Sequence, residues 1–320
     1  MIAYNEAANI ERCVRSVLVQ AGAPNLGAPV PEVPVLQVPL EVIVVDDAST
    51  DATAAIVAGL ASEDRRVKLV RLEDNMGRGN ARATGVEHAA GDLVAMVDGD
   101  IVLPPDWLSR CLAALPGHDA AGGKAVPDGD VAYVCRVFGL RPRGRASTMT
   151  LTGNNALFRR EVFRLVRFDR SLSEGEDIAL NHDMARAGLR AARVPGLAVT
   201  HCESKSFSQS VRWLYQSGKG GARQLERYHQ MRVPDLTFAG LLGCLLAGGG
   251  LAVRQRRAYP AAALPVAWLI VAAAGHILAC FRPSRDTVGR LALATVVDAL
   301  MVGSYSAGRL AGHFGRRLGV

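Results

Sequence analysis

The chain has 320 residues, enough for one large domain and a further segment. Its formal net charge of +7 is unevenly distributed, because residues 207–320 carry 14 Lys and Arg against 4 Asp and Glu, whereas residues 1–206 carry 23 against 26. The nearly neutral front part argues against general nucleic-acid binding, which requires a basic face on the folded domain. A basic, apolar tail favours a membrane partner instead.

The six cysteines are scattered, without a paired C-x-x-C spacing. We expect reduced and mostly structural thiols, consistent with a catalytic face in the cytosol. The opening segment MIAYNEAANIERC has neither the basic nor the apolar region of a secretory signal, so we expect none.

The first 100 residues alternate between helix and strand patterns. Apolar residues at helical spacing predict an amphipathic helix over 7–20, and a proline-rich surface loop follows over 22–39. The next predicted elements are, in order, a buried strand at 40–50, a helix at about 52–61 with Ser49 or Asp51 as N-cap, a strand at 66–72, a helix at 80–91 with Gly91 as C-cap, and a strand at 92–98. This alternation is typical of an α/β fold, a mostly parallel sheet with helices on both faces.

Two acid pairs close predicted strands, namely Asp46 with Asp47 and Asp98 with Asp100. In an extended backbone Asp98 and Asp100 point to the same side, and two like charges so close raise each other's pKa unless a cation lies between them. Ligands of such sheets bind at the carboxyl ends of the strands, which favours a site here. The alternatives are a polar turn for the second pair and helix capping for the first.

The tail differs in kind from the rest of the chain. We predict an amphipathic interfacial segment over residues 207–235 and a membrane region over residues 236–320. The membrane region has two candidate spans at 236–253 and 260–281. A third candidate, 291–308, is weaker because it contains Asp298. The first is uncharged for 18 residues, about 27 Å as a helix, which is close to the thickness of a bilayer core. The alternative is a set of buried helices in a soluble core, but two such runs in succession favour the membrane.

Six segments in order resemble the family 2 glycosyltransferases, which have the GT-A fold. They are AYNEAANIERCVRSVL, EVIVVDDASTDAT, NMGRGNARATGVEHAAGDLVAMVDGD, TGNNALFRREVF, FDRSLSEGEDIALNHDMARAG and QSVRW. The resemblance covers residues 2 to about 220. It implies a GT-A catalytic domain over 1–206, with a nucleotide-sugar half to about residue 100 and an acceptor half over 101–206.

The resemblance implies a metal site and a donor site. Asp98 and Asp100 match the D-x-D element that holds Mg²⁺ or Mn²⁺ against the donor diphosphate. Asp47 matches a position that bonds the nucleobase, and Tyr4 an aromatic residue that stacks on it, with packing at a strand end as the alternative for Tyr4. The full set of residues that the resemblance places at the donor nucleotide is Tyr4, Asn5, Asp46, Asp47, Asn75, Gly79, Arg82 and Asp98.

The resemblance also implies a base and an acceptor site. Asp177 matches the catalytic base, which takes the proton of the acceptor hydroxyl during transfer with inversion; the alternative is that Glu176 and Asp177 only complement a helix dipole. The residues implied on the acceptor side are Thr152, Gly153, Asn154, Glu176, Gln209, Arg212 and Trp213. The last three form a Q-x-x-R-W element, for which an interfacial helix with an aromatic anchor is the alternative. His201, after an apolar strand, is either a metal ligand or a structural histidine.

Two features depart from the family. Only Met1 and Ile2 precede AYNE, where the family has a longer apolar strand, so we expect either a start further upstream or a shortened first strand. The segment 22–39 also replaces a short loop.

The function implied is that of a metal-dependent inverting glycosyltransferase of the cell membrane, with its catalytic domain on the cytoplasmic side. It would move a sugar from a UDP- or GDP-sugar donor to a lipid-linked or polysaccharide acceptor. A catalytically inactive membrane scaffold of the same fold is the alternative. A nucleotidyltransferase would require a Gly-rich, basic loop near the N-terminus, where AYNEAANIE is acidic.

Overall fold

The structure is a computed structural model of the chain. It describes residues 1–21, 38–128, 151, 153–202, 207–228, 233–256, 259–280, 300 and 303–312. These residues divide into two compact units, the first ending at residue 202 and the second beginning at residue 207. Most of the predicted loop 22–39, Thr152 and most of the candidate span 291–308 lie outside the described residues.

A parallel sheet forms from the first part of the chain. Its strands are β1 (Ile2–Ala3), β2 (Val42–Asp46) and β3 (Val67–Arg71), in that spatial order. Ile2 also makes an isolated parallel bridge to Asp98. The first strand is therefore short, and it touches two neighbours at its carboxyl end.

A second, mixed sheet follows in the same unit. Its strands lie in the order β4 (Leu93–Val97), β7 (Asn155–Arg159), β6 (Ala120–Pro127), β8 (Ala191–His201) and β5 (Ile101–Val102). Only the β6–β8 pairing is parallel, and the other three are antiparallel. The predicted parallel arrangement thus holds for β1, β2 and β3 and for the bridge between Ile2 and Asp98, whereas the second sheet, which includes β4, mixes both directions.

Helices separate the strands as predicted. Those of the first unit are α1 (Ile10–Leu18), the 3₁₀ turn η1 (Val19–Ala21), α2 (Thr53–Glu63), α3 (Arg78–His88), α4 (Trp107–Ala114), α6 (Val162–Leu165) and α7 (Glu176–Arg186). The prediction of Gly91 as C-cap is wrong: α3 ends at His88, and its C-cap Ala89 is extended. The following amide of Ala90 donates to Glu41 Oε1 at 2.6 Å, which draws the chain out of the helix.

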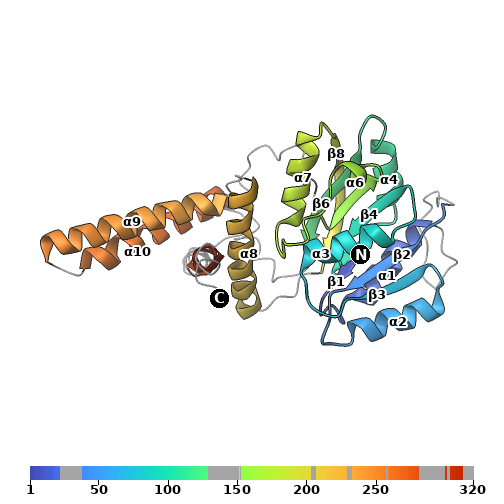
Figure 1. Cartoon of the computed structure of the whole chain (residues 1–320), viewed down its shortest axis with the longest axis horizontal. Helices are drawn as coiled ribbons and strands as arrows, with labels where there is room; N and C mark the ends of the chain where they lie inside the picture. Colours follow the sequence, from blue (N-terminus) through green and yellow to red (C-terminus); the bar gives the residue numbers. More distant parts are fainter. Residues whose placement is uncertain are drawn as a thin grey trace. The chain divides into compact units, whose positions relative to one another are not determined.

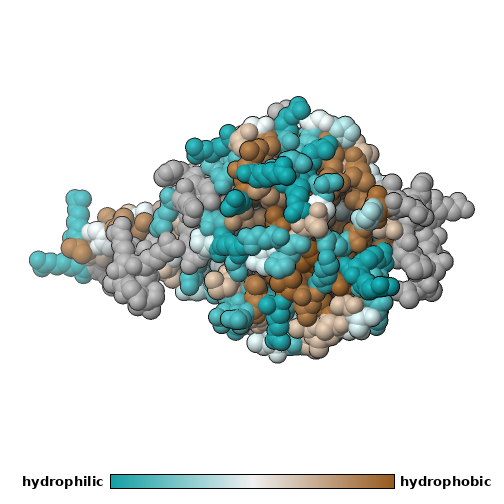
Figure 2. Space-filling view, turned by 45° about the vertical axis from the view of Figure 1, so that its right-hand side comes forward, coloured by the Kyte–Doolittle hydropathy of each residue, from teal (hydrophilic) through white to brown (hydrophobic). Residues whose placement is uncertain are grey.

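Helices cover both faces of the parallel sheet. Successive side chains of a strand point to opposite faces, so the apolar side chains of β2 are buried on both sides. Val42 and Val44 of β2 belong to the buried cluster that includes α1 and α4, whereas Ile43 and Val45 pack in a separate cluster with Ala81 of α3. On the face drawn in Figure 2, hydrophilic side chains stand among the hydrophobic patches.

The described residues of the second unit form helices. They are α8 (Phe207–Tyr228), α9 (Val233–Gln255), α10 (Tyr259–Cys280) and a helix over 303–312. Figure 1 shows α9 and α10 side by side, and a Cβ at Gly240 of α9 would collide with the Trp268 ring of α10. Small residues likewise let α8 approach the helix 303–312, since a Cβ at Gly308 would collide with the carbonyl oxygen of Tyr215. Ser304 Oγ donates to the carbonyl of Val211 at 2.8 Å across the same contact.

Helices α9 and α10 coincide with the first two predicted spans. In the part of the chain that the structure describes, however, no helix is both long and apolar enough to cross a membrane. The prediction of transmembrane spans at 236–253 and 260–281 is therefore not supported.

Candidate active site

The acid pairs come together at the carboxyl ends of the strands. The register of β1 sets Ala3 opposite Asp46 on β2, and Ile2 opposite Asp98 beyond the end of β4. Asp46 and Asp98 thus lie on either side of β1, at one edge of the unit. This confirms the expectation, drawn from the strand order, that the two acid pairs lie at the carboxyl ends of the strands. Ligand binding at this edge stays a prediction.

Asp46 and Asp47 tie the end of β2 to neighbouring loops. The two carboxylate oxygens of Asp47 accept hydrogen bonds from the amides of Met76 and Gly77, each at 2.9 Å. Burial raises the pKa of Asp47, and these two donors partly offset the effect. Asp46 is fully buried, with its Oδ2 3.5 Å from Arg71 Nε. A role in binding the nucleobase stays a prediction for both.

Three residues predicted at the donor lie on loops beside these acids. Tyr4 follows β1 and is 45% exposed, which leaves its ring open to a ligand. Asn5 has a left-handed backbone, φ 57°, and its Oδ1 accepts from the amide of Thr50 at 2.8 Å. Asn75 lies exposed in the loop before α3.

Gly79 has a packing role. Its amide donates to the carbonyl of Leu172 at 2.9 Å, and a Cβ at this position would collide with the carbonyl oxygens of Asp169 and Leu172. Glycine therefore allows α3 to lie directly against the segment that precedes α7.

Arg82 links the end of β4 to α7 and to the segment before β7. Its side chain is only 2% exposed and donates to Asp98 Oδ1 at 2.8 Å, to Glu176 Oε1 at 2.8 Å and to the carbonyl of Gly153 at 2.5 Å. Burial lowers the pKa of Arg82, but the facing carboxylates of Asp98 and Glu176 outweigh it and hold that pKa above its usual value. Burial likewise raises the pKa of Glu176, against the opposing effect of Arg82. The guanidinium is thus a fixed cation at the centre of the site.

Asp177 lies in the first turn of α7, next to this cation. Its Oδ2 accepts from the amide of Gly153 at 3.2 Å. Asn181, one turn further along, donates to the carbonyl of Leu151 at 2.7 Å and accepts from the amide of Leu151 at 3.0 Å. Asn181 was not among the predicted site residues, although its i, i+4 spacing from Asp177 places both on one face of the helix.

The segment before β7 forms the wall opposite α7. A Cβ at Gly153 would come within 3.0 Å of both Arg82 Cζ and Asp177 Cβ, so only glycine fits between them without a shift. The buried Oδ1 of Asn154 has no hydrogen-bond partner among the residues described.

Asp98 and Asp100 meet different partners. The backbone turns at Gly99 and Asp100 rather than staying extended. Asp98 pairs with Arg82, and Asp100 Oδ2 lies 2.9 Å from His201 Nε2 because β5 pairs with the end of β8. No group of three or more His, Cys, Asp and Glu side chains gathers closely enough to hold a metal within the described ranges. Carboxylates are the ligands that a hard divalent cation prefers, with further ligands from phosphate and water, so the chemistry of Asp98 and Asp100 suits such an ion. Metal binding by these two residues stays a prediction.

Gln209, Arg212 and Trp213 belong to α8 of the second unit. Arg212 is exposed and Trp213 is partly buried. Their contact with an acceptor stays a prediction.

Residues 1–168 match the family described as glycosyl transferase family 2. This is more than half of the chain, which therefore belongs to that family. Its α/β fold agrees with a mannosyltransferase from Pyrobaculum calidifontis, solved in complex with GDP-Man and Mn²⁺. The match covers 98% of this chain and 86% of that structure, with 22% sequence identity and a TM-score of 0.53, which shows a GT-A-like fold.

Two curated relatives resemble the chain over shorter lengths. The succinoglycan biosynthesis protein ExoO of Rhizobium meliloti is 34% identical over 66% of this chain and 62% of its own length. The undecaprenyl-phosphate 4-deoxy-4-formamido-L-arabinose transferase of Shewanella sediminis is 32% identical over 37% of this chain and 33% of its own. The chain thus matches less than two thirds of the length of either relative.

Proposed function

We propose that the chain is an inverting glycosyltransferase that moves a sugar from a nucleotide-sugar donor to a lipid-linked or polysaccharide acceptor. The observation that carries the proposal is the buried Arg82, which bonds Asp98 on one side and Glu176, the neighbour of Asp177, on the other. It holds the donor-side acid and the candidate base in one fixed arrangement.

Asp177 is the general base in this proposal. It takes the proton from the acceptor hydroxyl as that oxygen forms a bond to the anomeric carbon, while the bond from that carbon to the diphosphate oxygen breaks. The amide of Gly153 and the position of Asp177 in the first turn of α7 fix the direction of the carboxylate. Tyr4, whose side chain is 45% exposed, would stack on the nucleobase.

A divalent cation, Mg²⁺ or Mn²⁺, would be held by Asp98 and Asp100, with His201 as a further ligand or as a partner that orients Asp100. Bound there, it would offset the charge that develops on the leaving diphosphate. Arg82 contributes a permanent positive charge to the same region.

The donor and acceptor classes rest on the relatives. The solved mannosyltransferase holds a GDP-sugar, and the two curated relatives are named for succinoglycan biosynthesis and for transfer to undecaprenyl phosphate. We infer a UDP- or GDP-sugar donor and an acceptor used in building the cell envelope. Gln209, Arg212 and Trp213 of α8 would contact that acceptor.

The test is nucleotide release from a panel of UDP- and GDP-sugars, with Mg²⁺ or Mn²⁺ and with or without chelator, in the presence of membrane lipid acceptors. We expect release from one donor, its loss in chelator, and a fall of at least about 100-fold for Asp177→Asn. The matched control is Asp183→Asn, on the same helix and partly exposed, which should retain activity. Equal activity of Asp177→Asn and the parent chain would refute the role of the base. Anomeric inversion is checked by the product's NMR coupling constants.

We also propose that the second unit attaches the enzyme to the cytoplasmic face of the cell membrane. Large apolar side chains on α9 and α10 are exposed, among them Leu246 at 70% and Val253 at 81%, and Arg254 and Arg256 are exposed beside them. Exposed apolar side chains beside basic ones suit an anionic lipid surface. Flotation with anionic vesicles should recover the chain, and Leu246→Ser with Val253→Ser should reduce recovery several-fold. Equal recovery would refute this attachment.

A further inference from the structure

The side chain of Asn181 forms three hydrogen bonds with backbone groups. Its Nδ2 donates to the carbonyls of Leu151 and Asp177, each at 2.7 Å, and its Oδ1 accepts from the amide of Leu151 at 3.0 Å. The bond to Asp177 is local, because the two residues are one helical turn apart. The two bonds with Leu151 join α7 to a residue that lies 30 positions earlier in the chain.

The bonds with Leu151 copy the pairing of two antiparallel strands, in which one residue both donates to and accepts from its partner. An asparagine side chain is suited to this because it carries one carbonyl oxygen and one NH₂ group. Leu151 is only 4% exposed, and a buried peptide group without a partner costs free energy. Asn181 thus satisfies both backbone groups of Leu151 and fixes this residue against α7.

Gly153 follows Leu151 by two residues and contacts the candidate base. Its amide donates to Asp177 Oδ2 at 3.2 Å, and its carbonyl accepts from Arg82 at 2.5 Å. The other carboxylate oxygen, Asp177 Oδ1, accepts from the amide of Ile178 at 2.8 Å. Ile178 is part of α7, whereas Gly153 is not, so the bond from Gly153 depends on how this residue is held against the helix.

The bond from Gly153 to Asp177 is sensitive to the position of Leu151. At 3.2 Å it is at the long end of the usual range for N–H···O bonds, and a further shift would break it. Two residues of backbone reach at most about 7 Å, so a displacement of Leu151 is passed on to Gly153. Asparagine is also a poor helix former, and its place in the second turn of α7 is explained by these contacts rather than by propensity.

We propose that Asn181 is a positioning residue for sugar transfer, which holds Leu151 against α7 and thereby keeps the Gly153 amide on the carboxylate of Asp177. This inference rests on the proposed function, in which Asp177 is the base. A carboxylate held from outside its own helix keeps one direction toward the acceptor hydroxyl. Without the contact, Asp177 turns about its side-chain bonds, which slows proton transfer and leaves donor binding unchanged.

Hydrogen exchange of the full chain tests the contact without measuring sugar transfer. In Asn181→Ala, the amides of Leu151 and Gly153 should exchange at least about tenfold faster, while those of β2 stay within about twofold of the parent chain. The matched control is Arg186→Ala, on the exposed last turn of the same helix, which should change neither. Asn181→Asp keeps the size of the side chain but loses the donor to Leu151, so its effect should have the same direction. Unchanged exchange of Leu151 and Gly153 in both Asn181 variants would overturn the proposal.

Steady-state kinetics test the positioning role. For Asn181→Ala, kcat should fall about 10- to 100-fold while the KM for the donor stays within about twofold, as expected for a residue that acts on the base and not on donor binding. Arg186→Ala should keep both constants. Faster exchange at Leu151 and Gly153 with an unchanged kcat would show a structural contact only and would overturn the role in transfer.

A double variant separates action through Asp177 from a general loss of structure. Once Asp177 is replaced by asparagine, Asn181→Ala should lower kcat by no more than about twofold further, because the group that it positions is gone. A further fall equal to that in the parent chain would overturn the proposal. Loss of activity in Asp177→Asn with full activity in Asn181→Ala refutes the positioning role alone, whereas activity in both refutes the base and with it the proposed function.

Discussion

Replacing Arg82 by lysine tests whether the buried cation organises the site. Lysine keeps the positive charge but presents one ammonium group, whereas arginine donates in a planar fork to Asp98, Glu176 and Gly153 at once. We expect the variant to lose about two of the three bonds. At about 1.5 kcal/mol for each bond to a charged group, the free energy of unfolding should fall by about 3 kcal/mol.

The assay is urea unfolding followed by the fluorescence of Trp107, which is buried in the first unit. The other two tryptophans, Trp213 and Trp268, are replaced by phenylalanine in every chain compared. Arg186→Lys, on the exposed last turn of α7, is the control and should change the free energy of unfolding by less than about 0.5 kcal/mol.

A double-mutant cycle separates the ion pair from packing. If Arg82 and Glu176 stabilise each other, the effects of Arg82→Lys and Glu176→Gln should differ from additivity by more than about 1 kcal/mol. The guanidinium does not hold the site together if the free energy of unfolding of Arg82→Lys lies within about 0.5 kcal/mol of that of the parent chain and the effects of the two substitutions are additive.

Three further predictions concern single positions. Gly79→Ala should lower the free energy of unfolding by about 2 kcal/mol because its Cβ meets two backbone carbonyls, whereas Gly59→Ala, in open space on α2, should raise it by about 0.5 kcal/mol in the same urea titration. Burial raises the pKa of Asp51, but hydrogen bonds from neighbouring hydroxyl and amide groups outweigh it and lower that pKa overall. The resulting stabilisation is present above the unfolded-state pKa of about 3.9 and is lost as pH falls through the lower folded-state pKa, so Asp51→Asn should lower the free energy of unfolding at pH 7 and lower it less as pH falls below about 3.9. Gly308→Leu should separate its helix from α8 and speed limited proteolysis of α8 several-fold, whereas Gly249→Leu, with open space around it, should not; equal rates would contradict the packing described.

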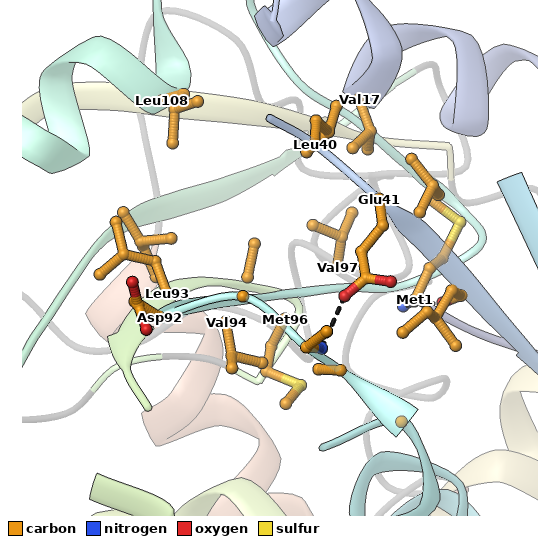
Figure 3. Close-up of a pocket in the computed structure, with 18 of the residues that line it drawn as sticks. Met1, Val17, Leu40, Glu41, Asp92, Leu93, Val94, Met96, Val97 and Leu108 are labelled. Carbon is orange, nitrogen blue, oxygen red and sulfur yellow. Dashed lines mark hydrogen bonds between the residues drawn. The ribbon is translucent and has the colours of Figure 1, made fainter. Parts of the chain in front are cut away.

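Local pattern was sufficient to predict the βαβ order and the edge at which the acids gather. A strand has period two and a helix period 3.6, so runs such as VIVVD and IERCVRSVL reveal their elements without tertiary information. Parallel strands then bring their carboxyl ends to one edge, which placed Asp46 and Asp98 together correctly. The end of α3 was missed because Glu41, 49 residues away from Ala90, decides it (Figure 3).

What only the tertiary structure decided is which side chains meet. Arg82 lies 94 residues from Glu176 and 71 from Gly153, and no local spacing predicts contacts over such separations. The pairing of Asp100 with His201 likewise depends on β5 lying against β8. The close packing of Gly79 depends on the loop that contains Asp169, 90 residues later. A buried charge needs a partner in the folded chain because desolvation of an unpaired charge costs free energy. A short window of sequence does not show which charges will be buried together.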